Sequence, residues 1–231
     1  MKKIVALLFG ISTLLINAQQ KVNETLKKEL DGIMKEDQGF RMLYTSDTTP
    51  EKRNEILKDL NIDQKEFEKR GWEMVAEHDS LNIKTIERII SQYGYPGKTL
   101  VGEPTNTAAW YVIQHSTKIG KYLPLIKEAG KKKEIPFTLV AMMEDRYLMN
   151  QDKEQIYGTQ GKGEMTKDKD GKQIFVNFVW PVEDLKNVNK RRKEAGFDVT
   201  FEENVKRMFG PDFKYEPYTL KQVLELRNKN K

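Results

Sequence analysis

The chain has no cysteine and only two histidines among its 231 residues. The absence of cysteine excludes disulfide bonds, so the stability of the fold must come from packing. It also excludes thiol chemistry and a cleavage site of the lipid-anchored, lipoprotein kind. Any chemistry in this protein therefore depends on histidine, carboxylate, amide, hydroxyl or guanidinium groups.

Several sequence motifs of well-known catalytic and binding sites are missing as well. There is no glycine-rich phosphate loop, no Gly-x-Ser-x-Gly elbow and no His-Glu-x-x-His pair. The stretch from Asp168 to Gly171 resembles part of a calcium loop, but Asn177 stands where the bidentate carboxylate is required, so we interpret it as a turn. Two histidines and scattered carboxylates give little support for a metal site. We predict no metal ligands, and the cofactor, if any, is unknown.

The sequence has one extended apolar run, residues 4–16, which follows Lys2 and Lys3 and precedes Ala18. This arrangement is typical of a secretory signal peptide over residues 1–18. An uncleaved membrane anchor is the alternative. No other stretch approaches the roughly 20 apolar residues of a membrane-spanning helix. We therefore expect an exported, periplasmic or extracellular protein with no membrane span after signal cleavage.

The charge of the chain is close to balanced once its ends are set aside. The formal net charge is +5, of which Lys2 and Lys3 supply two charges and the basic C-terminal tail, residues 227–231, supplies three. The short basic runs at 131–133 and 190–193 have no interleaved aromatic residues, which is typical of solvated helix faces. We predict that nucleic acid is not a partner.

Apolar residues recur at helical spacing along most of the chain. This pattern predicts a mainly α fold with a small antiparallel β element (α+β), as a single compact helical domain over residues 19–231. Proline at position 50 and the Asp63 to Glu66 capping pattern predict two helix starts. The predicted helices cover residues 22–35, 55–60, 64–78, 83–93, 108–117, 122–129, 136–147, 183–194, 201–209 and 220–226.

The hydrophobic period changes in the region 155–180. Residues 155–160 and 173–180 have the pattern of strands, and the polar residues 167–172 between them have the pattern of a turn. This predicts a β-hairpin near residues 155–180. In the first predicted strand, Gln155, Tyr157 and Thr159 share one face and Gln160 lies opposite. Gly158 is expected either at a bulge or where a backbone or ligand approaches closely.

His115 is the candidate catalytic group. It follows Gln114 on a predicted helix that carries Trp110 on its apolar side, so it is expected at the edge of the core. A neutral imidazole there can act as a general base if a carboxylate such as Asp145 holds its other nitrogen. The alternative is a structural histidine. His78 is expected at a helix end, where the helix dipole accounts for it.

The remaining polar residues allow two interpretations. Arg146 with Asp145 is either a surface ion pair or part of a site. The amides and the phenol of residues 155–160, together with a guanidinium near an imidazole, suit recognition of a sugar, a peptide or a carboxylate. They equally suit an internal hydrogen-bond network that holds helices to a small sheet.

Taken in order, the polar motifs resemble those of a bacterial family known only as a domain of unknown function. The resemblance extends over roughly residues 24–200. Tyr95 stands where that family more often has tryptophan, and residues 162–172 resemble an insertion. The motifs are Asp37-Gln38-x-x-Arg41, Asp79-x-x-Asn82, Gly94-x-Pro96 with Val101-Gly102, Ala109-Trp110-x-x-x-Gln114-His115, Asp145-Arg146, Gln155-x-Tyr157-Gly158-Thr159-Gln160 and Val188-Asn189-x-Arg191-Arg192-x-x-x-Gly196.

The resemblance implies no activity, but polar motifs on several segments suggest convergence on one pocket. We hypothesise an exported hydrolase or transferase acting on a polar small molecule or a cell-envelope component. The alternatives are a non-catalytic ligand-binding module and a purely structural hydrogen-bond network. The predicted catalytic residues are His115 and Asp145, and the predicted ligand-binding residues are Asp37, Gln38, Arg41, Gln114, Arg146, Tyr157, Gln160 and Arg192.

Overall fold

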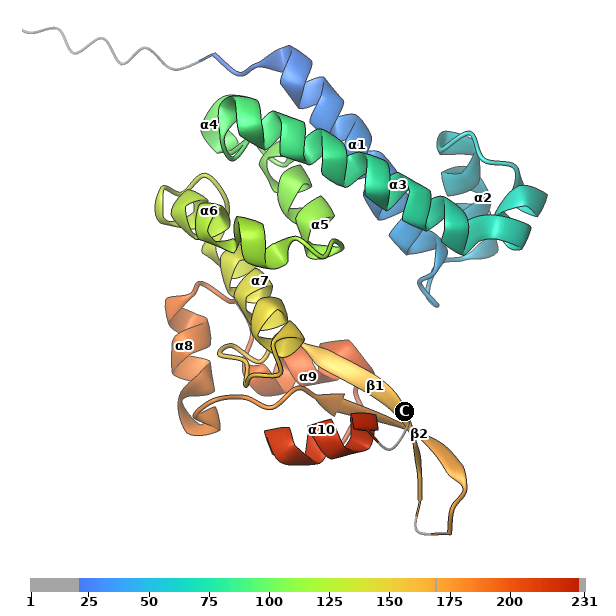
Figure 1. The fold of residues 1–231 in the computed structure, drawn as a ribbon, viewed down its shortest axis with the longest axis vertical. Helices are drawn as coiled ribbons and strands as arrows, with labels where there is room; N and C mark the ends of the chain where they lie inside the picture. Colours follow the sequence, from blue (N-terminus) through green and yellow to red (C-terminus); the bar gives the residue numbers. More distant parts are fainter. Residues whose placement is uncertain (1–20, 169, 229–231) are drawn as a thin grey trace, which may run out of the picture.

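The computed structural model describes residues 21–168 and 170–228, and it confirms a mainly α fold with one small antiparallel hairpin (Figure 1). The predicted signal peptide lies outside the described residues, as do the last three residues of the basic tail. In chain order the elements are α1 Glu24–Leu43, α2 Pro50–Asp59, α3 Gln64–Tyr93, α4 Lys98–Val101, η1 Thr105–Thr107, α5 Ala108–Gln114, α6 Ile119–Lys131, α7 Phe137–Asn150, β1 Gly161–Lys167, β2 Gln173–Val179, η2 Leu185–Asn187, α8 Val188–Glu194, α9 Phe201–Phe209 and α10 Leu220–Asn228.

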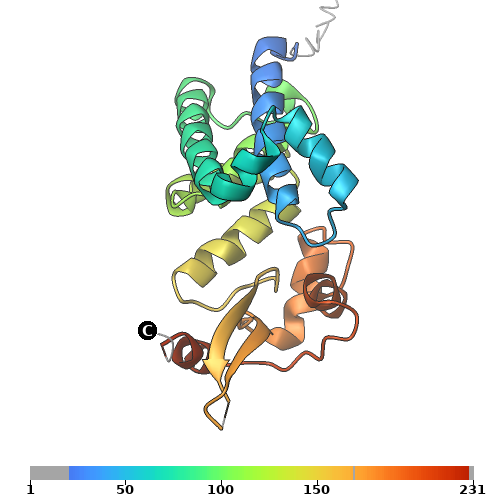
Figure 2. The same cartoon turned by 90° about the vertical axis from the view of Figure 1, so that its right-hand side faces the viewer.

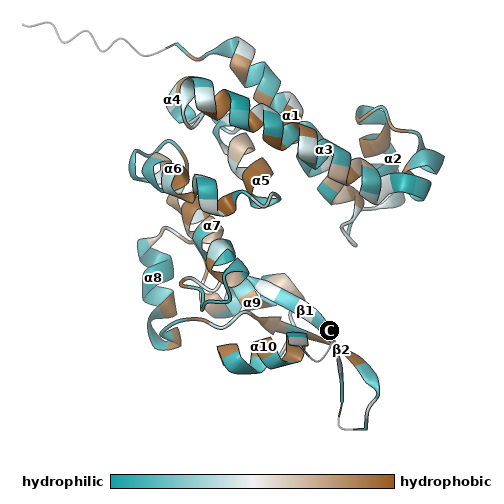
Figure 3. Cartoon of the chain, in the orientation of Figure 1, coloured by the Kyte–Doolittle hydropathy of each residue, from teal (hydrophilic) through white to brown (hydrophobic). Residues whose placement is uncertain are grey.

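The largest core cluster lies among the helices of the first two thirds of the chain. It joins α1, α3, α5, α6 and α7 through apolar side chains such as Leu30, Ile86 and Ile113. The helix α5 carries many of these residues, and Figure 3 shows it as largely hydrophobic beside the mixed surface of α3. A second cluster, which contains Phe40 and Leu57, packs the end of α1 against α2 and the start of α3.

Two predicted helix ends are wrong. The first helix does not stop before Phe40 but continues to Leu43, because both residues are buried against α2. Likewise, α3 does not break near Asp79 but runs as one helix of 30 residues, Gln64–Tyr93, with Asp63 as its N-cap and Gly94 as its C-cap. Tertiary packing of an apolar stripe stabilises a helix more than local propensity does, so polar residues inside these helices do not end them.

The hairpin pairs β1 with β2 in antiparallel register, with Gly161 opposite Val179 and Lys167 opposite Gln173. The predicted turn between the strands is confirmed, but the predicted strand at residues 155–160 is wrong. Apart from an isolated bridge between Gln155 and Val182, that segment is irregular, and β1 begins only after it. Only its ends, Gln155 and Gln160, bond to the backbone of residues 180–183, whereas the backbone groups between them are bonded to side chains from other elements.

The last third of the chain packs around the base of the hairpin. Val179 and Phe201 belong to a cluster with α8 and α9. On the other side, Phe178 and Trp180 pack against Val223 of α10. The helix α7 connects this region to the helices above it, as Figure 2 shows from the side. None of the helices between residues 21 and 228 combines the length and the apolar character of a membrane span.

The main core predicts a clear difference between two leucine substitutions. Leu30 of α1 is fully buried, whereas Leu81 of α3 is 59% exposed. Truncation of Leu30 to alanine leaves a cavity and should lower the free energy of unfolding by about 2–5 kcal/mol. The change Leu81→Ala should alter it by less than about 0.5 kcal/mol. Urea denaturation followed by circular dichroism measures both, and equal effects would contradict the packing described for α1.

Candidate functional site

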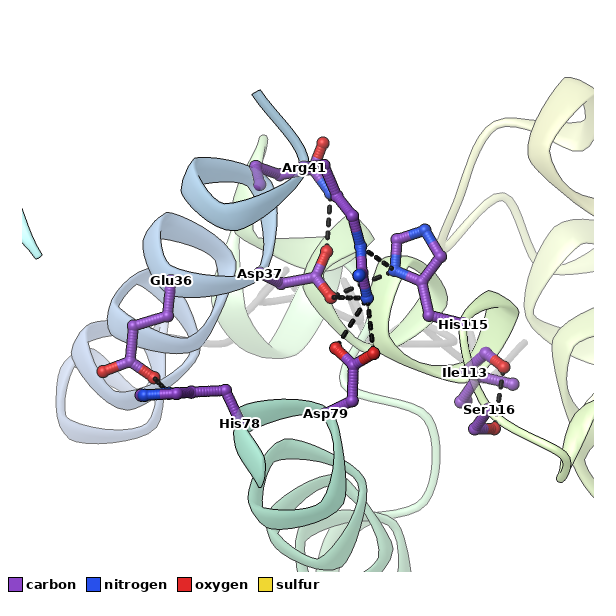
Figure 4. A network of polar contacts seen from close by, with 9 residues as sticks. Glu36, Asp37, Arg41, His78, Asp79, Ile113, His115 and Ser116 are labelled. Atoms are coloured by element: carbon purple, nitrogen blue, oxygen red, sulfur yellow. Dashed lines mark hydrogen bonds and ion pairs between the residues drawn. The ribbon is translucent and has the colours of Figure 1, made fainter. Parts of the chain in front are cut away.

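Four side chains from three helices meet in one polar cluster, which we call the His115 cluster: Asp37, Arg41, Asp79 and His115 (Figure 4). Asp37 and Arg41 are four residues apart on α1 and therefore lie on the same face of that helix. Asp79 comes from the middle of α3, and His115 is the C-cap residue of α5. The cluster thus depends on the continuity of both long helices.

Arg41 is the centre of the His115 cluster. Its Nη2 donates to both carboxylate oxygens of Asp79 at 2.6 and 2.7 Å, and it lies 3.7 Å from Oδ1 of Asp37. Asp37 is buried, and its other oxygen accepts a hydrogen bond of 2.6 Å from the neighbouring Gln38 amide. Two carboxylates against one guanidinium leave one formal negative charge beside the imidazole.

The ring nitrogen Nδ1 of His115 has two competing partners. It lies 3.1 Å from Oδ1 of Asp37 and 3.2 Å from Nε of Arg41. A protonated Nδ1 donates to Asp37, whereas an unprotonated Nδ1 accepts from Arg41, so one neutral imidazole makes only one of these bonds. When Nδ1 donates to Asp37, the ring proton is on Nδ1 and Nε2 carries a lone pair. When Nδ1 accepts from Arg41, the ring proton is on Nε2. The cluster can therefore present Nε2 as a base or as an acid.

The second ring nitrogen, Nε2, has no hydrogen-bond partner within residues 21–168 and 170–228. It points away from the three charged groups in Figure 4, and the His115 side chain is 21% exposed. Gln114 precedes His115, and its side chain makes no hydrogen bond to the cluster in the described part of the chain. The imidazole is thus held at Nδ1 and accessible at its edge.

His78 is separate from the His115 cluster. Its Nδ1 lies 3.4 Å from Glu36, and its ring packs against Phe40 at a centroid distance of 4.7 Å. The expectation that His78 lies at a helix end is wrong, because α3 continues for fifteen residues beyond it. The helix dipole therefore does not explain its position, whereas the contacts with α1 do.

A second polar group surrounds the irregular segment 155–160, and its centre is Asp145. This fully buried carboxylate accepts hydrogen bonds from the backbone N–H groups of Ile156, Tyr157 and Thr159, at 2.7 to 3.2 Å, and from the Thr159 hydroxyl. Burial raises the pKa of Asp145, and these donors offset part of the rise. All of these bonds go to the segment, so the carboxylate at His115 is Asp37 and not Asp145.

The carbonyl groups of the same segment are bonded to side chains from the last third of the chain. Arg191 donates to the carbonyl of Ile156, and Arg192 donates to that of Tyr157. Asn204 of α9 donates to the carbonyl of Gly158. Gly158 has a φ of +68°, and a Cβ there would lie 2.4 Å from the Phe201 ring, so the close approach expected at this glycine is that of Phe201.

Two glutamines close the segment on itself. The Gln155 amide donates to the carbonyls of Gln160 and Trp180, and its oxygen accepts from the backbone N–H of Gln160. Gln160 is buried, and its own amide donates to the Thr159 hydroxyl and, at 3.5 Å, to the carbonyl of Met142. The amide that was predicted to bind a ligand at Gln160 is therefore engaged inside the protein, and the buried Arg192 uses its Nε and Nη1 in the same way.

Arg146 differs from the other arginines around this segment. Within the described residues its guanidinium has no ion pair and no hydrogen bond, and burial lowers its pKa. Tyr157 is half-buried, and burial together with the nearby Glu144 raises the pKa of its phenol. By contrast, Arg192 stacks over Phe197 at 4.4 Å in addition to its two carbonyl contacts. A desolvated cation without a counter-ion is a candidate anchor for an anionic group.

The predicted site residues thus divide between two places. Asp37, Gln38 and Arg41 lie at His115, whereas Asp145, Gln160 and Arg192 hold the segment 155–160. Asp79, which was not among the predicted site residues, belongs to the His115 cluster through Arg41. Had residues 64–93 been predicted as one continuous helix, Asp79 would have been expected inside that helix rather than at its end. Across the described ranges, no group of three or more histidine or acidic side chains is arranged to hold a metal ion.

The fold and the two polar groups define a mainly helical protein whose polar motifs are built around an imidazole and a fixed irregular segment. Comparison with family models matches residues 71–213 to a family described as "Family of unknown function (DUF6624)". This match covers more than half of the chain, and the protein belongs to that family. The matched region begins at Gly71, so it does not include Asp37 and Arg41. No curated protein and no solved structure matches the chain.

The role of Asp145 predicts a loss of stability when its charge is removed. In Asp145→Asn, an amide N–H₂ group would replace an acceptor that faces several N–H donors, which should lower the free energy of unfolding by about 3 kcal/mol. The control is Asp198→Asn, because the Asp198 side chain is exposed. Thermal or urea unfolding distinguishes them, and an Asp145→Asn protein as stable as the control would refute the role assigned to this carboxylate.

Proposed function

We propose that the protein is an exported hydrolase or transferase that acts on a polar small molecule or a cell-envelope component, with His115 as its general base. One observation carries the proposal: Nδ1 of His115 contacts the buried carboxylate of Asp37 while Nε2 is accessible and without a partner in the described ranges. His78 also has a carboxylate at its Nδ1, but Glu36 is partly exposed and lies 3.4 Å away, whereas the Asp37 carboxylate at His115 is buried and lies 3.1 Å away.

In the proposed reaction, Asp37 orients the ring by accepting the Nδ1 proton, which leaves the lone pair on Nε2. Nε2 takes a proton from water or from a hydroxyl of the acceptor as that oxygen attacks the substrate. Asp37 stabilises the imidazolium that forms. Arg41, fixed by Asp79, supplies the opposing interaction at Nδ1 that favours return of the proton to the leaving group.

Recognition of the substrate is assigned to Arg146, whose guanidinium has no counter-ion in the described chain. A carboxylate or phosphate of the ligand would supply the missing acceptor. The same observation favours a second candidate function, a non-catalytic ligand-binding module, because an anion site needs no reaction. Arg192 and Gln160 are not assigned to the ligand, since both side chains are buried and the Gln160 amide and the Nε and Nη1 of Arg192 donate within the protein.

The tautomer of His115 can be tested with diethylpyrocarbonate, which modifies an unprotonated imidazole nitrogen. Because the chain has two histidines, a His78→Asn background leaves His115 as the only target. On that background Asp37→Asn should slow the modification severalfold, because Arg41 then remains at Nδ1 and the proton moves to Nε2. Asp79→Asn is the control, since Asp79 contacts Arg41 and not the ring. Equal rates in the two variants would mean that Asp37 does not set the tautomer.

Turnover is tested with p-nitrophenyl acetate, p-nitrophenyl phosphate and purified peptidoglycan as substrates. Any hydrolysis by the protein should fall by about 100-fold or more in His115→Asn, because the general base is lost. It should be unchanged in His78→Asn, which leaves the His115 cluster intact. Full activity in His115→Asn would exclude the proposed role. Stabilisation by one of these compounds without product, lost in Arg146→Ala, would instead favour the binding module.

A further inference from the structure

The side chain of Trp72 is the most exposed large hydrophobic group in the part of the chain that the structure describes. It lies near the start of α3 and is 67% exposed. The other two tryptophans, Trp110 and Trp180, are buried, and their indole N–H groups donate to backbone carbonyls. An indole left in water loses the hydrophobic stabilisation that burial would give it. Its position therefore suggests a surface that becomes covered when a ligand binds.

The Trp72 ring is held in a fixed orientation. It stacks on Tyr44, the C-cap residue of α1, with a centroid distance of 3.9 Å and an interplanar angle of 21°. Tyr44 also contacts Phe67 at 5.6 Å. The close approach of Tyr44 to α3 requires a glycine at position 71, since a Cβ there would lie 2.6 Å from the Tyr44 hydroxyl. The stacked pair is thus a preformed flat surface, which lowers the entropy cost of binding.

The stacked pair borders a cavity of about 600 Å³ between α2 and the start of α3. Hydrogen-bonding side chains complete its lining. Gln64 and Glu68 come from the first turns of α3, and Arg53 comes from α2. Arg70 is bonded to three glutamates of its own helix, among them Glu73 of the cavity. The site therefore combines one aromatic plane with amide, carboxylate and guanidinium groups around it.

We propose that this cavity binds a neutral glycan, with one sugar ring stacked on Trp72. The C–H face of a pyranose is flat and apolar and suits an indole plane, while its equatorial hydroxyls both donate and accept hydrogen bonds to planar polar side chains. A quaternary ammonium ligand would require rings arranged as a cage, whereas these two rings are stacked. The lining cations Arg53, Lys69 and Arg70 are nearly balanced by Glu68 and Glu73, so the cavity does not suit a polyanion such as nucleic acid.

The glycan site and the His115 cluster are on the same two helices. Tyr44 follows Arg41 by three residues on the α1 side, and Trp72 precedes Asp79 by seven residues on α3. At a rise of 1.5 Å per residue, the Cα atoms of Trp72 and Asp79 are about 10 Å apart on one face of α3. A glycan of several sugars stacked at Trp72 can therefore extend toward His115. Binding at Trp72 does not require the reaction proposed for His115.

The test uses the fluorescence of the full mature chain, in which only Trp72 is open to a quencher. Chitohexaose and cellohexaose are titrated in the presence of acrylamide. We expect at least one of them to protect the exposed tryptophan from quenching. If neither hexasaccharide does so, the proposal is overturned. Sedimentation velocity without sugar provides a second check, because self-association that shields Trp72 would make a second copy of the chain the occupant instead.

The affinity of each variant for glycans is measured by native affinity electrophoresis, as its retardation in gels that contain glycol chitin or hydroxyethyl cellulose. The affinity of Trp72→Ala for the retarding polymer should be lower by a factor of about ten or more. This is the loss typical of removing an aromatic anchor. Phe175→Ala is the matched control, because Phe175 is 62% exposed and lies outside the cavity. Gly71→Ala should weaken binding by displacing Tyr44. Retardation of Trp72→Ala equal to that of Phe175→Ala would disprove the site.

Discussion

The buried carboxylate of Asp145 fixes how the helical part of the protein is joined to the rest. An irregular segment cannot satisfy its own backbone groups, and burial without partners is costly for each of them. Asp145 on α7 takes the N–H groups of residues 156, 157 and 159, while Arg191 and Arg192 take the carbonyls of residues 156 and 157. The segment thereby connects α7, α8 and the first strand in one arrangement, and the position of the hairpin follows from it.

The His115 cluster is organised differently, since its charges are balanced across helices rather than against backbone groups. Arg41 shares its guanidinium between Asp79 and the Asp37–His115 pair. Such a partly exposed charge network contributes modestly to stability but determines geometry, because Nη2 of Arg41 is held by both Asp79 oxygens while Nε of the same guanidinium faces the imidazole. The imidazole is consequently fixed at one nitrogen by α1 while the other faces outward. The polar group around Asp145 is bonded within the protein, whereas the His115 cluster has an accessible nitrogen. The proposed reaction is assigned to His115 for this reason.

The fold class, most helices and the turn of the hairpin could be predicted from hydrophobic period and from caps such as Thr49 and Asp63. The errors have a common physical cause. Asp37 and Asp79 are polar residues that look like helix ends, but each has its partner on another helix. The side chains of residues 155–160 alternate in the pattern of a strand. Two of the carbonyl groups, however, accept hydrogen bonds from arginines about 35 positions later in the chain. Partners that are distant along the chain leave no local signal, so the carboxylate that holds His115 could not be identified from spacing.

The length of α3 restricts insertions and deletions in this helix, and no single contact shows that restriction. One uninterrupted helix of 30 residues carries both Trp72 and Asp79, so their relative direction is set by an angular phase of about 100° per residue. Inserting or deleting one residue between them would rotate Asp79 by about 100° relative to Trp72, so that the two side chains could not both keep their present partners. Between Trp72 and Asp79, substitutions should therefore be tolerated, whereas insertions and deletions should not.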